Sequence, residues 1–347
     1  MLHNTASSIF EPEPSQVPVA AKALPVVQVM LSQPRGFCAG VVRAIEIAER
    51  ALELHGAPVF VFHDIVRNSQ VLTDLRKRGL VFVDALSEVP SGAVIVFGAH
   101  GVSLAVVREA QLRGLNVIDA TCPLVSKVHQ QAQRYSRSGH TLIVVGDAGH
   151  EDDETAGTLG RVNTEVHWVS TLTDVARLAL PANTPLAYVT QTTLSVDDTH
   201  DVVAALKLRF PNIKGANIKG PNTADVCDAT QNRQNAVREL AQQVELILVV
   251  GAHDSANAMR LHEIAAQQGV AAYVVQDESE INAHWLTNLQ RIGVTAAAST
   301  PEVLVQRVAQ RLSELSVVNI LQSDVLDPRL EEGIVFRLPV ALMRPAA

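Results

Sequence analysis

The sequence is constrained most by a pattern that occurs three times along the chain. In each unit a cysteine comes directly before an amphipathic helical pattern, which is followed by a turn and a short apolar run. In the first unit Cys38 precedes apolar residues at helical spacing over 41–52, and the apolar run spans 57–62. The other two units begin at Cys122 and Cys227, so each interval between cysteines is about as long as one small α/β domain.

Strands and helices are expected to alternate along the whole chain, because each unit has a second half with another apolar run and another helix. The runs expected to form strands are 57–62, 93–97, 141–145, 186–189, 246–250 and 292–295. Such alternation predicts an α/β fold with mainly parallel sheets covered on both faces. We expect a disordered N-terminal extension at 1–26, three pseudo-equivalent α/β domains at 27–122, 123–224 and 225–318, and a C-terminal tail at 319–347.

Composition excludes several classes of protein. Hydrophobic residues make up 47% of the chain and charged residues 18%, so a large core can form and wholesale disorder is excluded. The net charge of -8 and the 4% of aromatic residues argue against nucleic acid as a partner. The N-terminal residues lack the pattern of a signal peptide, and no run of about 18 apolar residues occurs, so we expect a cytoplasmic protein without a membrane partner.

Polar residues cluster where the expected strands end. They are His63, Arg67, Asn68, His100, His150, Thr192, Ser255, Asn257 and Ser299. In open parallel sheets ligands bind beyond the carboxyl ends of the strands. Three domains that meet around one axis would bring these side chains and the three cysteines to one place.

The three cysteines have no Cys-x-x-Cys spacing, and their odd number does not suit a disulfide framework. Each is expected just before a helix, where the N-terminal dipole should lower the thiol pKa and favour anionic ligands. Three converging thiolates indicate either an iron–sulfur cluster or zinc, and zinc would need a histidine as its fourth ligand. A 4Fe-4S cluster bound by three cysteines would leave one iron open to a substrate oxygen.

Five sequence motifs carry a resemblance to a known family. They are P-R-G-F-C-A-G at 34–40, A-H-G-V-S at 99–103, D-A-T-C-P-L-V-S-K-V-H at 119–129, T-Q-T-T-L-S-V-D-D-T at 190–199 and A-T-Q-N-R-Q at 229–234. Together they resemble the 4-hydroxy-3-methylbut-2-enyl diphosphate reductases, over about residues 27–339. Several long motifs in one order are far more specific than a single glycine-rich loop.

The resemblance implies three domains in a trefoil around one 4Fe-4S cluster per chain, whose apical iron has no cysteine ligand. Cys38, Cys122 and Cys227 match the cluster ligands. The implied reaction removes an allylic hydroxyl with two electrons and two protons, giving isopentenyl and dimethylallyl diphosphate at the last step of the non-mevalonate (MEP/DXP) pathway. Reduced ferredoxin or flavodoxin is the expected electron donor, because the chain has no nicotinamide or flavin fingerprint.

The resemblance also implies a substrate site and a proton donor. The positions that match the substrate site are Arg67, His100, His150, Thr192, Ser255, Asn257 and Ser299. The family places its acid two residues after a histidine, but here two residues are inserted in the run from Gly149 to Thr158. Counting back from Gly157 gives Glu154, our preferred donor, and counting forward from His150 gives Asp152 as the alternative.

Three positions depart from the family pattern. Arg67 stands where the family has a histidine, Ala256 replaces a serine, and Met259 replaces a usual asparagine. Asp254, in the same stretch as Ala256, adds a negative charge that is unfavourable for phosphate if it points inward. Two alternatives therefore stand beside the reductase: a diverged paralogue that acts on another allylic diphosphate, and a cluster-based redox sensor.

Overall fold

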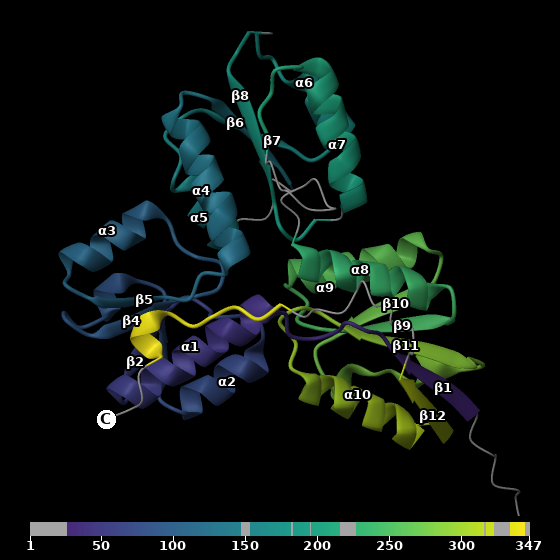
Figure 1. Ribbon diagram of the computed structural model, residues 1–347. Coiled ribbons are helices and arrows are strands. Elements are labelled where there is room, and N and C mark those ends of the chain that lie inside the picture. The colour runs from purple at the N-terminus through teal and green to yellow at the C-terminus, as the bar shows by residue number, and fades with distance from the viewer. Residues whose placement is uncertain are drawn as a thin grey trace, which may run out of the picture.

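Three parallel sheets with helices packed around them make up the described part of the protein. The computed structural model describes residues 26–146, 153–181, 183–194, 196–215, 227–315, 317–322 and 334–343. Within these residues the strand orders are β3-β2-β4-β5, β7-β6-β8 and β10-β9-β11-β1-β12, and every paired strand runs parallel to its neighbour. Figure 1 shows three lobes, each built around one sheet; we call them lobe 1, lobe 2 and lobe 3 in that order.

Lobe 1 is built on the four-stranded sheet. Its elements are α1 (Ala39–His55), β2 (Val59–Phe62), α2 (Ser69–Lys77), β3 (Leu80–Val83), β4 (Val94–Phe97), α3 (Leu104–Leu112) and β5 (Asn116–Asp119). Helix α1 buries the side chains of Ala44, Ile47 and Ala48 against the sheet residues Val61 and Val96. Burying an aliphatic side chain of this kind stabilises the fold by about 1.5–3 kcal/mol. The helix pattern and the apolar runs expected here are both confirmed.

Lobe 2 is built on the three-stranded sheet. Its elements are α4 (Pro123–Arg137), β6 (Thr141–Val145), α5 (Asp153–Leu159), β7 (Val166–Val169), α6 (Leu172–Arg177), β8 (Leu186–Thr190) and α7 (Val196–Arg209). Pro123 occupies the first turn of α4, where its missing N–H has no partner to lose. Ile143 of β6 and Tyr188 of β8 pack against Leu206 of α7, while Leu142 faces α4 in a separate cluster. The alternation along β6 therefore buries both faces of this sheet.

Lobe 3 is built on the five-stranded sheet. Its elements are α8 (Asp228–Ala241), β9 (Leu246–Val250), α9 (Ala256–Gln267), β10 (Ala271–Val275), β11 (Arg291–Ala296), α10 (Glu302–Leu315) and β12 (Val317–Gln322), together with β1 (Val26–Leu31). Figure 1 shows α8 and α9 on one face of the sheet and α10 on the other. Ile247 and Val249 of β9 pack towards α8 and α9, whereas Leu248 packs towards α10.

Strand β1 belongs to a different sheet from the one that its place in the sequence suggests. The repeat pattern assigns residues from 27 onward to the first domain, but β1 lies between β11 and β12 in lobe 3. Strand β12 completes the same sheet and crosses the expected boundary between residues 318 and 319. An apolar strand carries no signal in its own residues for which sheet it joins, so the pairing could not be read from the pattern.

The C-terminal residues 334–343 return from lobe 3 to lobe 1. Figure 1 shows this segment running across the molecule to α1. Leu342 is buried in the core of lobe 1, and the backbone carbonyl of Arg337 accepts a hydrogen bond of 2.9 Å from Arg43 Nε. In the described part of the chain, no helix combines the length and apolar character needed to span a membrane.

Candidate functional site

A cavity of about 130 Å³ lies between the three lobes and is lined by residues from all of them. Its polar lining includes Cys38, Arg67, His100, Cys122, Glu154, Thr192, Cys227, Ser255, Asn257 and Ser299. Except for Cys227, which directly precedes α8, these residues follow the carboxyl ends of β1, β2, β4, β5, β8, β9 and β11, or lie on the helix that comes next. Strand-end positions of six of them were expected from the sequence, and the structure brings them to one cavity.

Each cysteine is the residue immediately before a helix, and its backbone is tied to a loop from another part of the fold. Cys38 precedes α1, Cys122 precedes α4 and Cys227 precedes α8. Their amides donate to backbone carbonyls: Cys38 to Ala298 at 3.1 Å, Cys122 to Ala99 at 2.9 Å and Cys227 to Thr192 at 3.3 Å. Each thiol is therefore fixed in position by the backbone of a neighbouring strand end.

Gly40 shows how closely two of the sulfur atoms approach each other. A Cβ atom added to Gly40 would lie 2.8 Å from Cys122 Sγ and 3.8 Å from Cys38 Sγ. Real Cβ atoms do not approach other atoms as closely as 2.8 Å, so only glycine fits between these two thiols. The sulfur atoms of Cys38 and Cys122 thus lie on either side of a small space next to Gly40, which a larger residue at position 40 would fill.

Arg233 fixes the remaining cysteine segment to the first one. Its side chain is 1% exposed and belongs to α8, which begins after Cys227. The guanidinium donates to the carbonyls of Gly36 at 2.9 Å and Phe37 at 3.1 Å, just before Cys38. A buried arginine that satisfies backbone carbonyls on another element holds the two elements in register.

The pKa values of two cysteines depart from the expectation that a helix N-terminus lowers them. Burial raises the pKa of Cys227 to about 12, although the backbone N–H groups of Thr230 and Ala229 donate to its sulfur. Burial also raises the pKa of Cys122, and the nearby thiol of Cys38 adds to the effect in both cases. The expected lowering is therefore wrong for Cys122 and Cys227, because burial and mutual repulsion outweigh the helix dipole.

Three cysteine thiols line the same cavity, and thiolates are the ligands that soft metals and iron–sulfur groups prefer. Among the described residues, no group of three or more His, Cys, Asp or Glu side chains could hold a single metal ion. Three thiolates on one zinc would all lie about 2.3 Å from the same point. Converging thiols whose pKa values are raised by burial fit a cationic group that neutralises them and spans the space between them.

Glu154 reaches the cavity from α5 and is held there by Thr192. The Glu154 carboxylate is 5% exposed and accepts hydrogen bonds from the Thr192 hydroxyl at 2.8 Å and the Thr192 amide at 3.2 Å. Thr192 also contacts the cysteine site, because its backbone carbonyl accepts a hydrogen bond from the amide of Cys227. A buried carboxyl beside three cysteines is placed to give a proton to a ligand in the cavity.

The other polar side chains of the cavity lie where lobe 1 meets lobe 3. The Ser299 hydroxyl donates to the backbone carbonyl of Arg67 at 3.0 Å, and Asn257 Oδ1 accepts from the amide of Ala298 at 3.0 Å. Ser255 caps α9, and its Oγ accepts from the amide of Ala258 at 3.3 Å. Hydroxyl, amide, imidazole and guanidinium groups near a helix N-terminus are the donors that a diphosphate requires.

Some sequence predictions fall elsewhere or outside the described residues. His150 and Asp152 lie outside them, as does Glu151. His63 and Asn68 do not line the cavity; Asn68 instead caps α2, and its Oδ1 accepts from the amide of Val71. Sequence reasoning missed Thr193 and Thr230. The signal for Thr230 was its position three residues after Cys227, on the same side of α8.

His129, the last residue of the motif at 119–129, supports the segment that carries Glu154. It is 2% exposed, and a Cβ atom on Gly101 or Gly157 would lie within 3 Å of its ring. Burial lowers the pKa of His129 from 6.5 to about 4, and the charge of Arg161 adds to this. The ring is therefore neutral, and its Nε2 lies 3.4 Å from the backbone carbonyl of Glu154, which accepts the hydrogen bond.

Comparison with known proteins gives the family. A family model described as LytB protein matches residues 29–313, which is most of the chain. This chain belongs to the LytB family. Two LytB relatives are named 4-hydroxy-3-methylbut-2-enyl diphosphate reductase. One, from Bradyrhizobium diazoefficiens, is 53% identical and covers 91% of this chain and 99% of its own length; the other, from Burkholderia pseudomallei, is 51% identical and covers 92% and 99%.

Solved structures agree with the LytB assignment. The E-1-hydroxy-2-methyl-but-2-enyl-4-diphosphate reductase of Plasmodium falciparum is 34% identical, with a TM-score of 0.82 over 92% of this chain and 97% of that one. A second structure, of (E)-4-hydroxy-3-methyl-but-2-enyl diphosphate reductase, is described as the terminal enzyme of the non-mevalonate pathway. It is 29% identical, with a TM-score of 0.59 over 83% of this chain and 99% of that one.

Proposed function

We propose that this LytB protein reduces 4-hydroxy-3-methylbut-2-enyl diphosphate to isopentenyl diphosphate and dimethylallyl diphosphate. One observation carries the proposal: three cysteines from separate helix starts and one buried carboxyl line the same cavity. The reaction breaks the allylic C–O bond, takes up two electrons and two protons, and releases water. The curated relatives that bear this enzyme's name match more than nine-tenths of the chain.

We infer that Cys38, Cys122 and Cys227 hold one 4Fe-4S cluster at the centre of a trefoil of the three lobes. The fit rests on the donor set. Three thiols line one cavity, glycine at position 40 leaves room beside two of them that a Cβ atom would take, and burial raises the pKa of Cys122 and Cys227, so that a positively charged group would stabilise their thiolates. When bound, such a cluster supplies electrons and an iron without a cysteine ligand that can act as a Lewis acid. Reduced ferredoxin or flavodoxin is our proposed source of the electrons.

The protein's own groups position the substrate and manage its protons. Glu154 gives a proton to the hydroxyl oxygen as it leaves, because its buried carboxyl lines the cavity and bonds to Thr192, the residue whose carbonyl accepts from the amide of Cys227. Thr192 holds that carboxyl in place through its hydroxyl and its amide. We propose Glu154 as the donor, with Asp152 as the rival, although Asp152 lies outside the described residues.

The diphosphate is bound by the donors on the other side of the cavity. Arg67, His100, Ser255, Asn257 and Ser299 line it there, and His150 is the remaining proposed ligand from the sequence. The apolar side chains of Val41, Val66 and Val125 also line the cavity and suit the hydrocarbon part of the substrate. A redox sensor would need no such ring of phosphate donors, so the site favours an enzyme.

The test is an anaerobic assay. Protein purified without oxygen should contain about four irons per chain and should convert 4-hydroxy-3-methylbut-2-enyl diphosphate to both products when dithionite with a mediator dye supplies electrons. Iron-loaded protein that leaves this substrate unchanged but reduces a related allylic diphosphate would favour the diverged paralogue. Colourless protein with one zinc per chain would overturn the proposal.

A further inference from the structure

Arg67 and Asp254 bring opposite charges together across the boundary between two lobes. Arg67 belongs to the loop before α2 in lobe 1, and Asp254 belongs to the turn between β9 and α9 in lobe 3. Arg67 Nη1 lies 4.0 Å from Asp254 Oδ2, and both residues line the cavity. The ion pair therefore spans the part of the cavity that the proposed function assigns to the diphosphate.

The backbone of Arg67 is fixed from both sides. Its carbonyl accepts a hydrogen bond of 3.0 Å from the hydroxyl of Ser299, which reaches across from lobe 3. The next residue, Asn68, caps α2 by accepting from the amide of Val71 at 3.1 Å. The backbone of Arg67 is therefore held in place, whereas its side chain can contact either Asp254 or a ligand in the cavity.

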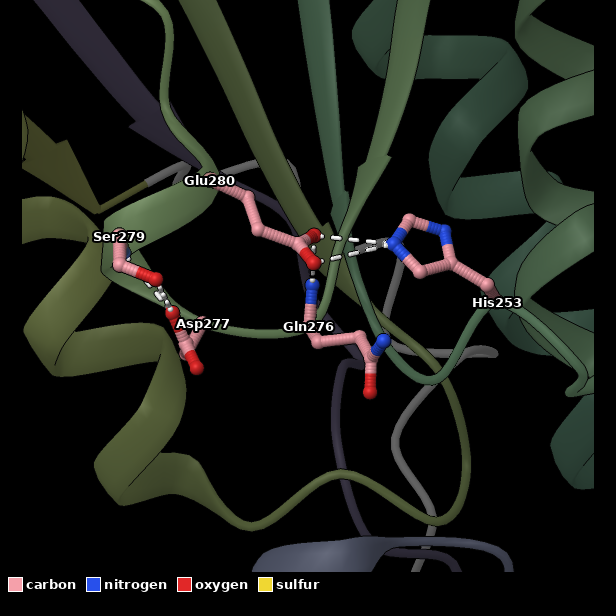
Figure 2. A network of polar contacts seen from close by, with 5 residues as sticks. All are labelled: His253, Gln276, Asp277, Ser279 and Glu280. Carbon is pink, nitrogen blue, oxygen red and sulfur yellow. Dashed lines mark hydrogen bonds and ion pairs between the residues drawn. The ribbon is translucent and has the colours of Figure 1, made fainter.

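The turn that carries Asp254 is fixed in the same way. Figure 2 shows His253 directed to the carboxylate of Glu280, with a closest distance of 3.0 Å between Nε2 and Oε2. The same carboxylate accepts from the amide of Gln276 at 2.8 Å, and Ser255 on the other side caps α9. These contacts leave the carboxylate of Asp254 at the cavity, with its side chain 76% exposed.

A carboxylate in this place repels a diphosphate, so its presence at the proposed binding site needs an explanation. An exposed ion pair is worth little, so a ligand with two or more negative charges can displace it from the arginine. We propose that Asp254 is a counter-ion that holds Arg67 in the substrate-free enzyme and competes with the diphosphate for its guanidinium. This inference rests on the proposed function, because it takes the ligand to be a diphosphate.

The competition has a consequence for turnover. Substrate and products carry the same diphosphate, so an arginine that bound it without competition would retain the products as firmly as the substrate. The carboxylate of Asp254 pairs again with the guanidinium of Arg67 when the diphosphate dissociates. The residue thereby sets the affinity for the anionic end of the ligand, while the hydrocarbon end is bound elsewhere in the cavity.

The experiment measures the binding of inorganic diphosphate to the anaerobically purified protein by calorimetry. Asp254→Asn and Asp254→Ala should each tighten binding by about fivefold, the upper value for an exposed ion pair. The KM for the allylic substrate should fall by a similar factor. Asp201→Asn is the matched control, because that side chain is also 76% exposed, lies on α7 and does not line the cavity. It should leave the affinity unchanged.

A second arm separates the ion pair from general repulsion. In an Arg67→Gln background, which itself should weaken binding, Asp254→Asn should improve affinity by clearly less than it does in the parent protein. An equal improvement in both backgrounds, or tighter binding by the Asp201→Asn control, would overturn the pairing. Unchanged or weaker binding by both Asp254 variants would overturn it as well. A parent protein that does not bind inorganic diphosphate at all would instead refute the proposed substrate site, and this inference with it.

Discussion

The buried imidazole of His129 should make the stability of the protein fall as the solution becomes acidic. Because its pKa is about 4 in the folded protein and 6.5 in the reference state, the unfolded chain binds a proton first as the pH falls. The stabilisation is therefore complete above about pH 6.5 and is lost progressively between about pH 6.5 and 4. The full difference of about 2.5 pKa units corresponds to about 3 kcal/mol, of which about 2 kcal/mol is lost between pH 7.5 and 5.

The measurement is the free energy of unfolding by urea at several pH values in that range, followed by circular dichroism. His129→Gln retains an N–H donor for the carbonyl of Glu154 but cannot bind a proton, so its free energy of unfolding should depend on pH by about 2 kcal/mol less than that of the parent. The control is His55→Gln, at the exposed end of α1, which should keep the dependence of the parent. If His129→Gln and the parent lose stability in parallel as the pH falls, the reasoning about His129 is refuted.

Three further predictions concern the cysteine site and the acid. Glu154→Gln should lower the turnover of the allylic substrate by at least about 100-fold while the iron content stays unchanged. If this variant is fully active and Asp152→Asn is inactive, Asp152 is the proton donor instead. Gly40→Ala should lose most of its bound iron, measured by iron analysis, because its Cβ would lie 2.8 Å from Cys122 Sγ; normal iron content would show that the space between the thiols is larger than described. Arg233→Met should lower the free energy of unfolding by about 3 kcal/mol and reduce iron content, because three backbone carbonyls lose their donor, and a variant with the parent's stability in urea would contradict that role.

The regular elements could be predicted from the sequence because their patterns are local. The runs at 141–145 and 246–250 coincide with β6 and β9, and the helices after Cys38, Cys122 and Cys227 begin at the next residue. The sheet to which β1 belongs could not be predicted. Its partners β11 and β12 are far away in the sequence, and any central strand of a parallel sheet has the same apolar composition.

The site could be predicted where residues follow strand ends, precede the three repeated helices or match the family motifs. Arg67, His100 and Thr192 line the cavity as expected. The raised pKa of Cys227 depends on how deeply the assembled lobes bury it, which no helix position reveals. Two further contacts join elements that only the tertiary fold brings together. They are the hydrogen bond of His129 to the Glu154 carbonyl and the ion pair of Arg67 with Asp254.

The position of β1 inside the sheet of lobe 3 has a consequence for how the protein matures during synthesis. Strand β1 is the first described strand to leave the ribosome, and it must wait for β11 and β12, the last described strands to be made, before both of its edges are paired. Until then the amide of Cys38 lacks the partner that holds it in the folded protein, because it donates to the loop after β11. Binding of the proposed cluster should therefore be a late event, open only to chains whose translation has passed residue 322.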